Sequence, residues 1–206
     1  AARAAGLPTA PAKPIASACT ATPQGLRNAD ALALQAECCP VLDYAQVNPF
    51  AFAPAIAPHI AAREAGVTLS TEALADAVQG VLEGRADFTL VEGAGGWRVP
   101  LNARETLAAL PIHLQLPVIL VVGVRLGCIS HALLSAEAIA HDGLVLAGWV
   151  ANIIDPAMSR LEENLATLDE LVPAPCLGRV PRLAEASAAR VAAYLRLAAL
   201  AHPPCR

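Results

Sequence analysis

Residues 116–134 read LPVILVVGVRLGCISHALL, and this stretch decides the fold class. Residues 116–122 are rich in Val, Ile and Leu, which is typical of a strand covered on both faces. Residues 130–140 then predict a helix, which ends at the turn pair Asp142-Gly143. A buried strand followed by a helix favours an α/β fold with a parallel sheet.

The same alternation continues on both sides of this stretch. Further strands are predicted over residues 9–15, 88–92, 144–151 and 176–180. Further helices are predicted over residues 28–35, 70–82, 159–171 and 184–200, and a Pro-rich connector over residues 38–57. The length of 206 residues favours a single domain over residues 1–206. Parallel sheets bind ligands outside the carboxyl ends of their strands, so we expect the functional site there.

Composition excludes several classes of protein. Hydrophobic residues make up 56% of the chain and charged residues 16%, which excludes a disordered chain or a coiled coil. The net charge is −4, the basic residues are scattered and aromatics amount to 3%, so no nucleic-acid partner is expected. The longest apolar run covers residues 118–124, whereas a membrane span takes about 20 residues, so no membrane partner is expected.

Cysteine usage indicates a reducing compartment. The chain contains no C-x-x-C motif, and its first residues lack the pattern of a signal peptide. We therefore predict a cytoplasmic protein whose cysteines pack as small hydrophobic residues. The six cysteines are Cys19, Cys38, Cys39, Cys128, Cys176 and Cys205.

Glu92 is the first candidate for chemistry. It ends a predicted strand and precedes the glycine cluster at residues 93–96. A carboxylate that faces a loop without bulky side chains suits Mg2+ and a phosphate that approaches the backbone closely. The alternative is a tight glycine turn beside a solvated glutamate.

Lys13 is the only lysine of the chain, beside thirteen arginines. Its ammonium and the hydroxyl of Ser17 would hold an anion between them, or both residues are exposed loop positions. Asp30 lies in the first turn of a predicted helix, where it complements the helix dipole or serves as a second metal ligand.

Two further positions follow predicted strands later in the chain. The amide of Asn152 offers a donor and an acceptor to an adenine edge, or the residue belongs to a turn. Residues 127–130 open a helix, where free N–H groups favour a carboxylate or a phosphate.

Several segments, in order and over nearly the whole length, together resemble the dethiobiotin synthase family. These segments are KPIAS (13–17), TPQGLRNADAL (22–32), VNPF (47–50), VEGAGGWRVPL (91–101), the stretch at 116–134, and LAGWVAN (146–152). The resemblance implies a P-loop NTPase-like fold. It also implies ATP-dependent carboxylation and ring closure of 7,8-diaminopelargonate with CO2, which gives dethiobiotin in biotin biosynthesis.

The resemblance also implies roles for individual residues. Lys13 would neutralise the carbamate and the transferring phosphoryl group, and Ser17 would hydrogen-bond the carbamate. Asp30 and Glu92 would hold Mg2+ on the ATP phosphates. The residues that would line the nucleotide are Gly93, Ala94 and Gly95, with Asn152, Pro181, Arg182 and Leu183 on the adenine side. The residues that would bind the substrate carboxylate, from the other subunit of a homodimer, are Gly127, Cys128 and Ile129.

One departure from the family concerns its first element, a strand, a P-loop of the form G-x-x-x-x-G-K-[ST] and a helix. The 206 residues contain no such motif. We therefore expect that a segment of about 25–30 residues is missing. Because its strand would be buried in the sheet, we expect the chain as written to fold poorly and to be impaired in ATP-driven turnover.

Two alternative functions stay open at this point. One is a related P-loop amidoligase of cofactor biosynthesis that acts on another acid. The other is a non-catalytic remnant that only dimerises or binds a ligand. A retained nucleotide site would raise the melting temperature in the presence of ATP and Mg2+.

Overall fold

The computed structural model describes residues 1–84 and 86–200, without the side chain of residue 199. The chain forms two compact units, one of residues 2–114 and one of residues 115–206 together with Ala1, and each unit is described by itself. The single domain predicted over residues 1–206 stays a prediction.

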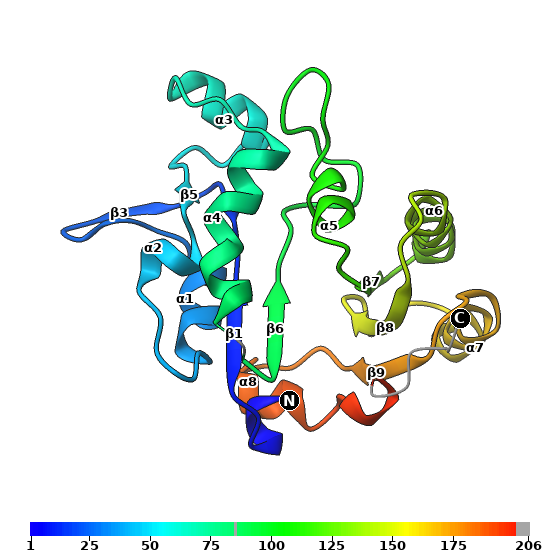
Figure 1. Cartoon of the computed structure of the whole chain (residues 1–206). Coiled ribbons are helices and arrows are strands. Elements are labelled where there is room, and N and C mark those ends of the chain that lie inside the picture. The colour runs from blue at the N-terminus through cyan, green and yellow to red at the C-terminus, as the bar shows by residue number, and fades with distance from the viewer. Residues whose placement is uncertain (85, 201–206) are drawn as a thin grey trace. The chain divides into compact units, whose positions relative to one another are not determined.

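The first unit contains short parallel strand pairs covered by helices. Strand β1 (Thr9–Ala12) lies beside β6 (Phe88–Val91), and β2 (Ile15–Ala16) pairs with β5 (Phe50–Ala51), both in parallel (Figure 1). Strands β3 (Thr20–Thr22) and β4 (Gly25–Arg27) form an antiparallel ribbon. The helices are the 3-10 turn Arg3–Ala5, α1 (Ala29–Ala36), α2 (Tyr44–Val47), α3 (Pro58–Glu64), α4 (Thr71–Glu83) and α5 (Ala109–His113).

The second unit is a three-stranded parallel sheet with helices between its strands. Strands β7 (Val118–Val124), β8 (Leu146–Ile153) and β9 (Cys176–Val180) lie in that order. Helix α6 (Cys128–His141) connects β7 to β8, and α7 (Leu161–Leu171) connects β8 to β9. The core residues Trp149, Leu165 and Leu168 are fully buried. The chain continues through α8 (Ala188–Ala192) and a 3-10 turn, Leu197–Leu200.

The predicted α/β class with parallel strands is confirmed, and several element boundaries agree closely. Strand β9 has the predicted bounds. The helix predicted over residues 70–82 is α4, and its cap is Ser70, whose hydroxyl accepts a hydrogen bond from the Ala73 N–H at 3.1 Å. Helix α1 is capped by Asn28, whose side chain accepts from the N–H groups of Asp30 and Ala31.

Two sequence predictions are wrong. The helix predicted over residues 184–200 is limited to α8, because Leu195 bridges to Gly178 and the Arg196 N–H donates to the Leu177 carbonyl at 2.7 Å. These bonds supply the edge of β9 with partners that a continuous helix would not offer. The connector predicted over residues 38–57 contains α2 and β5, whose backbone bonds depend on distant segments rather than on sequence periodicity.

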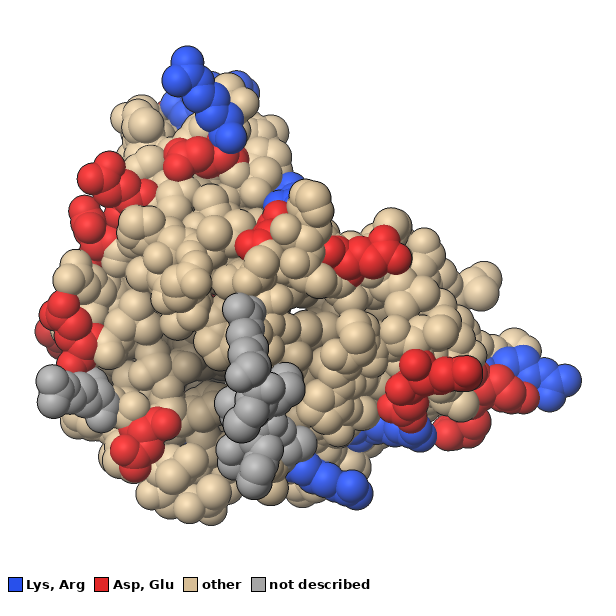
Figure 2. All heavy atoms as spheres, turned by 45° about the vertical axis from the view of Figure 1, so that its right-hand side comes forward, with Lys and Arg blue, Asp and Glu red and all other residues tan. Residues whose placement is uncertain are grey.

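Charged side chains lie on the surface, and most of the described cysteines are buried or half-buried. Figure 2 shows acidic and basic side chains interspersed on the face that it draws. Within the described ranges, no helix has the length and apolar character that crossing a membrane requires. The five cysteines that the structure describes are free thiols. Cys19, Cys38 and Cys128 are buried and Cys176 is half-buried, whereas Cys39 is exposed, so the prediction that the cysteines pack as small hydrophobic residues is wrong for Cys39. Cys205 lies outside the described residues.

We expect Gly148→Ala to destabilise the protein. A Cβ at residue 148 would lie 2.6 Å from Cγ of Leu177, a fully buried side chain. Overpacking of this kind costs about 1–3 kcal/mol, which thermal denaturation measures as a lower melting temperature. The matched control is Gly80→Ala on an exposed face of α4, where a Cβ meets nothing within 4 Å. That variant should gain about 0.5–1 kcal/mol, so equal melting temperatures for the two variants would contradict the packing argument.

Candidate functional site

The carboxyl ends of β1 and β6 bring Lys13 and Glu92 together. Ala12 pairs with Val91 in the parallel register, so the next residue of each strand leaves the sheet at the same edge. The Lys13 ammonium Nζ lies 2.7 Å from Oε1 of Glu92 and donates to the Gly93 carbonyl at 3.3 Å. Residues 79 positions apart in the sequence thus form one ion pair.

Asp30 joins this pair from helix α1. Its Oδ2 lies 3.4 Å from Nζ of Lys13. The Lys13 side chain is only 6% exposed, whereas the side chains of Asp30 and Glu92 are 64% and 40% exposed. A buried ammonium is tolerated because carboxylates pair with it. These carboxylates are more exposed than the lysine, so they are accessible to a ligand from solution. The predicted cluster of one ammonium and two acids is therefore present as a geometric unit.

The loop after Glu92 presents backbone rather than bulky side chains. Gly95 has φ +74°, a conformation that favours glycine, and a Cβ there would lie 2.9 Å from Cγ2 of Val99. The loop closes on itself where the Leu107 N–H donates to the Val99 carbonyl at 2.7 Å. Gly93 and Ala94 lie in the same turn, so the structure places the predicted nucleotide-lining segment directly beside Lys13.

Glu105 anchors this loop to the start of α4. Its Oε1 accepts from the Thr71 N–H at 3.3 Å, and its Oε2 accepts from the Asn102 amide at 2.6 Å. The Asn102 amide also donates to the Leu69 carbonyl at 2.9 Å. Hydrogen bonds from Thr71 and Asn102 hold the pKa of the Glu105 carboxyl below its ordinary value. The sequence analysis did not identify this residue.

Ser17 follows β2, whose strand partner is β5 and not the β1–β6 pair that ends at Lys13 and Glu92. It is partly buried, and its carbonyl accepts a hydrogen bond from Nδ2 of Asn28 at 3.2 Å. Asn28 belongs to a group of buried polar residues, with Tyr44 and Asn48, that the sequence analysis did not single out. Asn28 is the first residue of the helix predicted over residues 28–35, which was a usable signal because asparagine is a preferred N-cap.

The other predicted residues lie at the carboxyl edge of the β7–β8–β9 sheet. Asn152 on β8 pairs in register with Gly123 and Val180 and is exposed. The residues that follow β9 are Pro181, Arg182 and Leu183, and Arg182 donates to the Ile154 carbonyl at 3.2 Å. The structure thus brings the predicted adenine-side residues to one edge of this sheet, while their role in binding stays a prediction.

The start of α6 only partly offers the free amides that the sequence predicts. Gly127 caps the helix with φ +92°. Cys128 is buried, and its N–H donates to the Arg125 carbonyl at 3.0 Å. Ile129 packs against the apolar core of the same unit. One of the expected amide donors is therefore already bonded within the turn.

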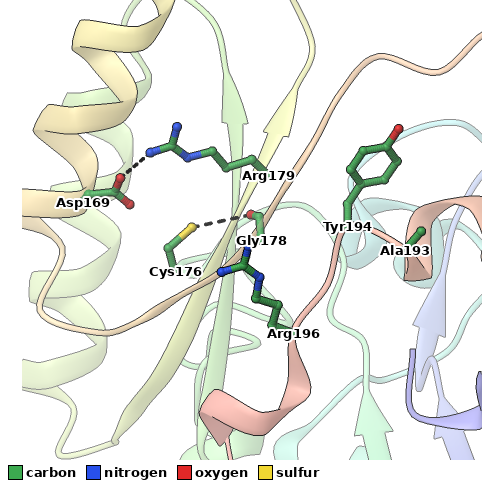
Figure 3. Close-up of a pocket in the computed structure, with 7 residues that line it drawn as sticks. All are labelled: Asp169, Cys176, Gly178, Arg179, Ala193, Tyr194 and Arg196. Carbon is green, nitrogen blue, oxygen red and sulfur yellow. Dashed lines mark hydrogen bonds and ion pairs between the residues drawn. The ribbon is translucent and has the colours of Figure 1, made fainter. Parts of the chain in front are cut away.

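The second unit also contains an open cavity of about 520 Å³ that includes none of the predicted site residues. Figure 3 shows Arg179 directed toward Asp169 at this cavity, where the two side chains form an ion pair. The cavity residues are Asp169, Cys176, Gly178, Arg179, Ala193, Tyr194 and Arg196.

Comparison with known proteins identifies close relatives. A family model described as an AAA domain matches residues 13–190. The chain is 74% identical over 197 residues to the ATP-dependent dethiobiotin synthetase BioD of Pseudomonas paraeruginosa, a match that covers 96% of this chain and 86% of the relative. It is 71% identical to the protein of that name from Pseudomonas aeruginosa, with the same coverage. The protein of that name from Cellvibrio japonicus is 60% identical over 97% of this chain and 87% of its own length.

We expect the Glu105 carboxylate to stabilise the fold in a pH-dependent way. Because its folded pKa is lowered, its contribution is present above the ordinary value of 4.5 and is lost as the pH falls through the lower folded value. The free energy of unfolding of Glu105→Gln should therefore be lower than that of the unmodified protein at neutral pH, and the difference should shrink in acid. Denaturant unfolding at several pH values measures this. Glu64→Gln, at an exposed position of α3, serves as the control, and a Glu105→Gln deficit that stays constant down to pH 3 would contradict the assignment.

Proposed function

Because this chain belongs to the dethiobiotin synthetase family, we propose that it catalyses the ATP-dependent carboxylation and ring closure of 7,8-diaminopelargonate with CO2 to dethiobiotin, in biotin biosynthesis. The observation that carries this function to the chain's own residues is the buried ammonium of Lys13 between Glu92 and Asp30. The names of the relatives favour this activity over an amidoligase or a non-catalytic remnant.

The reaction places negative charge where Lys13 can neutralise it. One amine of the substrate takes up CO2 as a carbamate, which ATP then phosphorylates. The second amine attacks the carbamate carbon, the cyclic urea closes and phosphate leaves. A cation that is already held by its neighbours stabilises the developing phosphoryl charge without having to reorganise during the reaction. Lys13, with 6% of its side chain exposed and two carboxylate partners, meets this requirement.

The carboxylates of Asp30 and Glu92 suit Mg2+ on the ATP phosphates. Mg2+ in nucleotide sites is bound by one or two carboxylates together with substrate phosphates, and both acids here are accessible. Across residues 1–84 and 86–200, His, Cys, Asp and Glu form no group of three that could hold a metal, so an all-protein cage is not the site we propose. When bound, Mg2+ would offset the charge of the phosphates.

The remaining proposed contacts follow from position. Ser17 lies four residues after Lys13 in the sequence and is proposed to bind the carbamate. The turn at residues 93–95 is proposed to line the nucleotide. Asn152 and residues 181–183 are proposed on the adenine side. Residues 127–129 are proposed to bind the substrate carboxylate from the partner in a homodimer.

The free thiols among the described residues support the proposal that the enzyme works in the cytoplasm.

The phosphate-binding loop is proposed to come from a strand that the 206 residues do not supply. Among the described strands, β6 pairs only with β1, which leaves its other edge without a strand partner. Leu90 on β6 is 36% exposed, an unusual position for a leucine in a parallel sheet. A further strand at this edge would cover the leucine and bring a P-loop next to Glu92.

The activity assay tests the function directly. The chain is incubated with 7,8-diaminopelargonate, bicarbonate, ATP and Mg2+, both alone and preceded by a strand–P-loop–helix segment. Dethiobiotin is detected by mass spectrometry. We expect Lys13→Ala to lower kcat by about 100-fold or more, because the charge acts on the transition state. Arg160→Ala, at an exposed ion pair, should leave kcat unchanged. A Lys13→Ala enzyme with unchanged kcat would remove Lys13 from the mechanism.

The metal proposal has its own test. Glu92→Gln keeps the size of the side chain and removes its charge, so we expect half-maximal activity to need about tenfold more Mg2+. Glu162→Gln, whose carboxylate is exposed and pairs with Arg179, is the matched control and should keep the unmodified titration curve. Overlapping curves for Glu92→Gln and the unmodified enzyme would limit Glu92 to its ion pair with Lys13.

A further inference from the structure

Three polar side chains that take no part in the proposed chemistry connect the backbones of the site residues. Asn48 makes the first connection. Its Nδ2 donates to the Lys13 carbonyl at 2.7 Å and reaches the Phe50 carbonyl at 3.5 Å. Asn48 is only 3% exposed, and the Lys13 N–H in turn donates to the Val47 carbonyl at 2.7 Å. The backbone of Lys13 is thus held on both its donor and its acceptor side.

Tyr44 makes the second connection. Its hydroxyl donates to Oδ1 of Asn48 at 3.0 Å and accepts from the Asn28 N–H at 2.7 Å. Burial raises the pKa of the Tyr44 phenol, so the hydroxyl keeps the proton that it donates. The Arg27 guanidinium lies 4.1 Å from the centre of the tyrosine ring and further limits its movement.

Asn28 completes the chain of hydrogen bonds. Its Oδ1 accepts from the Asp30 N–H at 3.0 Å, and its Nδ2 donates to the Ser17 carbonyl at 3.2 Å. Asn28 is 7% exposed, so both ends of its amide are used in a largely dry environment. A continuous path therefore leads from the Lys13 carbonyl through Asn48, Tyr44 and Asn28 to the backbone of Asp30.

We propose that Tyr44 is a positioning residue of this site, whose hydroxyl couples Asn48 to Asn28 and thereby fixes the Lys13 ammonium relative to Asp30 and Ser17. The catalytic consequence rests on the proposed function, whereas the positioning itself does not. Tyr44 lies in α2, a four-residue helix that is too short to be stable alone, so its place depends on these tertiary bonds. Catalysis is sensitive to misplacement on the scale of an ångström, which such a frame prevents.

The single lysine of the chain makes the proposal measurable without turnover. Protein labelled only in lysine, with a lysine-free tag, gives one side-chain ammonium signal by NMR, and that signal reports on Lys13. In the unmodified protein we expect slow exchange of its protons, because Nζ is buried and bonded to Glu92 and Gly93. In Tyr44→Phe we expect a shifted signal and exchange about fivefold faster, the factor that fits the loss of one neutral hydrogen bond.

The matched control is Tyr194→Phe, since Tyr194 is the chain's other tyrosine and is 41% exposed. Its Lys13 signal should equal that of the unmodified protein. Asn28→Ser is the second variant, because serine still caps α1 but its shorter side chain does not reach the Ser17 carbonyl as the amide does. A smaller shift of the same signal is expected there, and circular dichroism confirms that each variant is folded.

Activity separates this proposal from the proposed function. Tyr44→Phe should lower kcat about tenfold while the KM for ATP stays within about twofold, because the hydroxyl positions the cation rather than binding nucleotide. If the unmodified protein forms no dethiobiotin even when a P-loop segment precedes it, the proposed function fails, and the NMR comparison still decides whether Tyr44 positions Lys13. A Lys13 signal in folded Tyr44→Phe or Asn28→Ser that is indistinguishable from the unmodified one overturns the proposal, whatever the activity.

Discussion

The desolvated ammonium of Lys13 is the constraint on which the site depends. An ammonium with 6% of its side chain exposed must have negative partners, and here they are Glu92 at 2.7 Å and Asp30 at 3.4 Å. This requirement brings three segments to one place: the end of β1, the end of β6 and the first turn of α1. The two acids are more exposed than the lysine. The protein therefore holds the cation in place, and the carboxylates remain accessible to a ligand.

Two kinds of support surround this cluster, and each uses backbone groups. On one side, the turn at residues 93–95 has a positive φ at Gly95, and a later part of the same loop is anchored through Glu105 to the start of α4. On the other side, Asn48, Tyr44 and Asn28 connect the main chain of Lys13 to that of Asp30. Such buried polar groups are costly unless every donor and acceptor is matched, so they hold one arrangement more strictly than apolar packing would. A rigid frame of this kind suits a reaction that is mainly positioning and charge stabilisation.

Part of the site could be predicted from the rule that parallel sheets bind ligands at the carboxyl ends of their strands. Glu92 was identified because it ends an apolar strand, and Asp30 because it lies in the first turn of a helix. The resemblance to dethiobiotin synthases joined them to Lys13, and the structure places all three together. Tyr44 and Asn48 were missed because they lie in a segment without periodicity, where α2 forms through contacts with distant residues. The helix expected over residues 184–200 failed for a related reason, since its alanine-rich sequence could not reveal that residues 195 and 196 bond to the edge of β9.

Local rules therefore account for several of the helices and strands, whereas the family was indicated by the resemblance of segments along the chain. Hydrophobic periodicity and helix capping depend on residues that are close together in the sequence, so both can be recognised from the sequence alone. The distances within the Lys13 cluster, the burial of the ammonium and the bonds of Tyr44 were decided by the tertiary structure alone. These contacts join residues up to 80 positions apart in the sequence. Which polar side chains come into contact depends on how the whole chain packs.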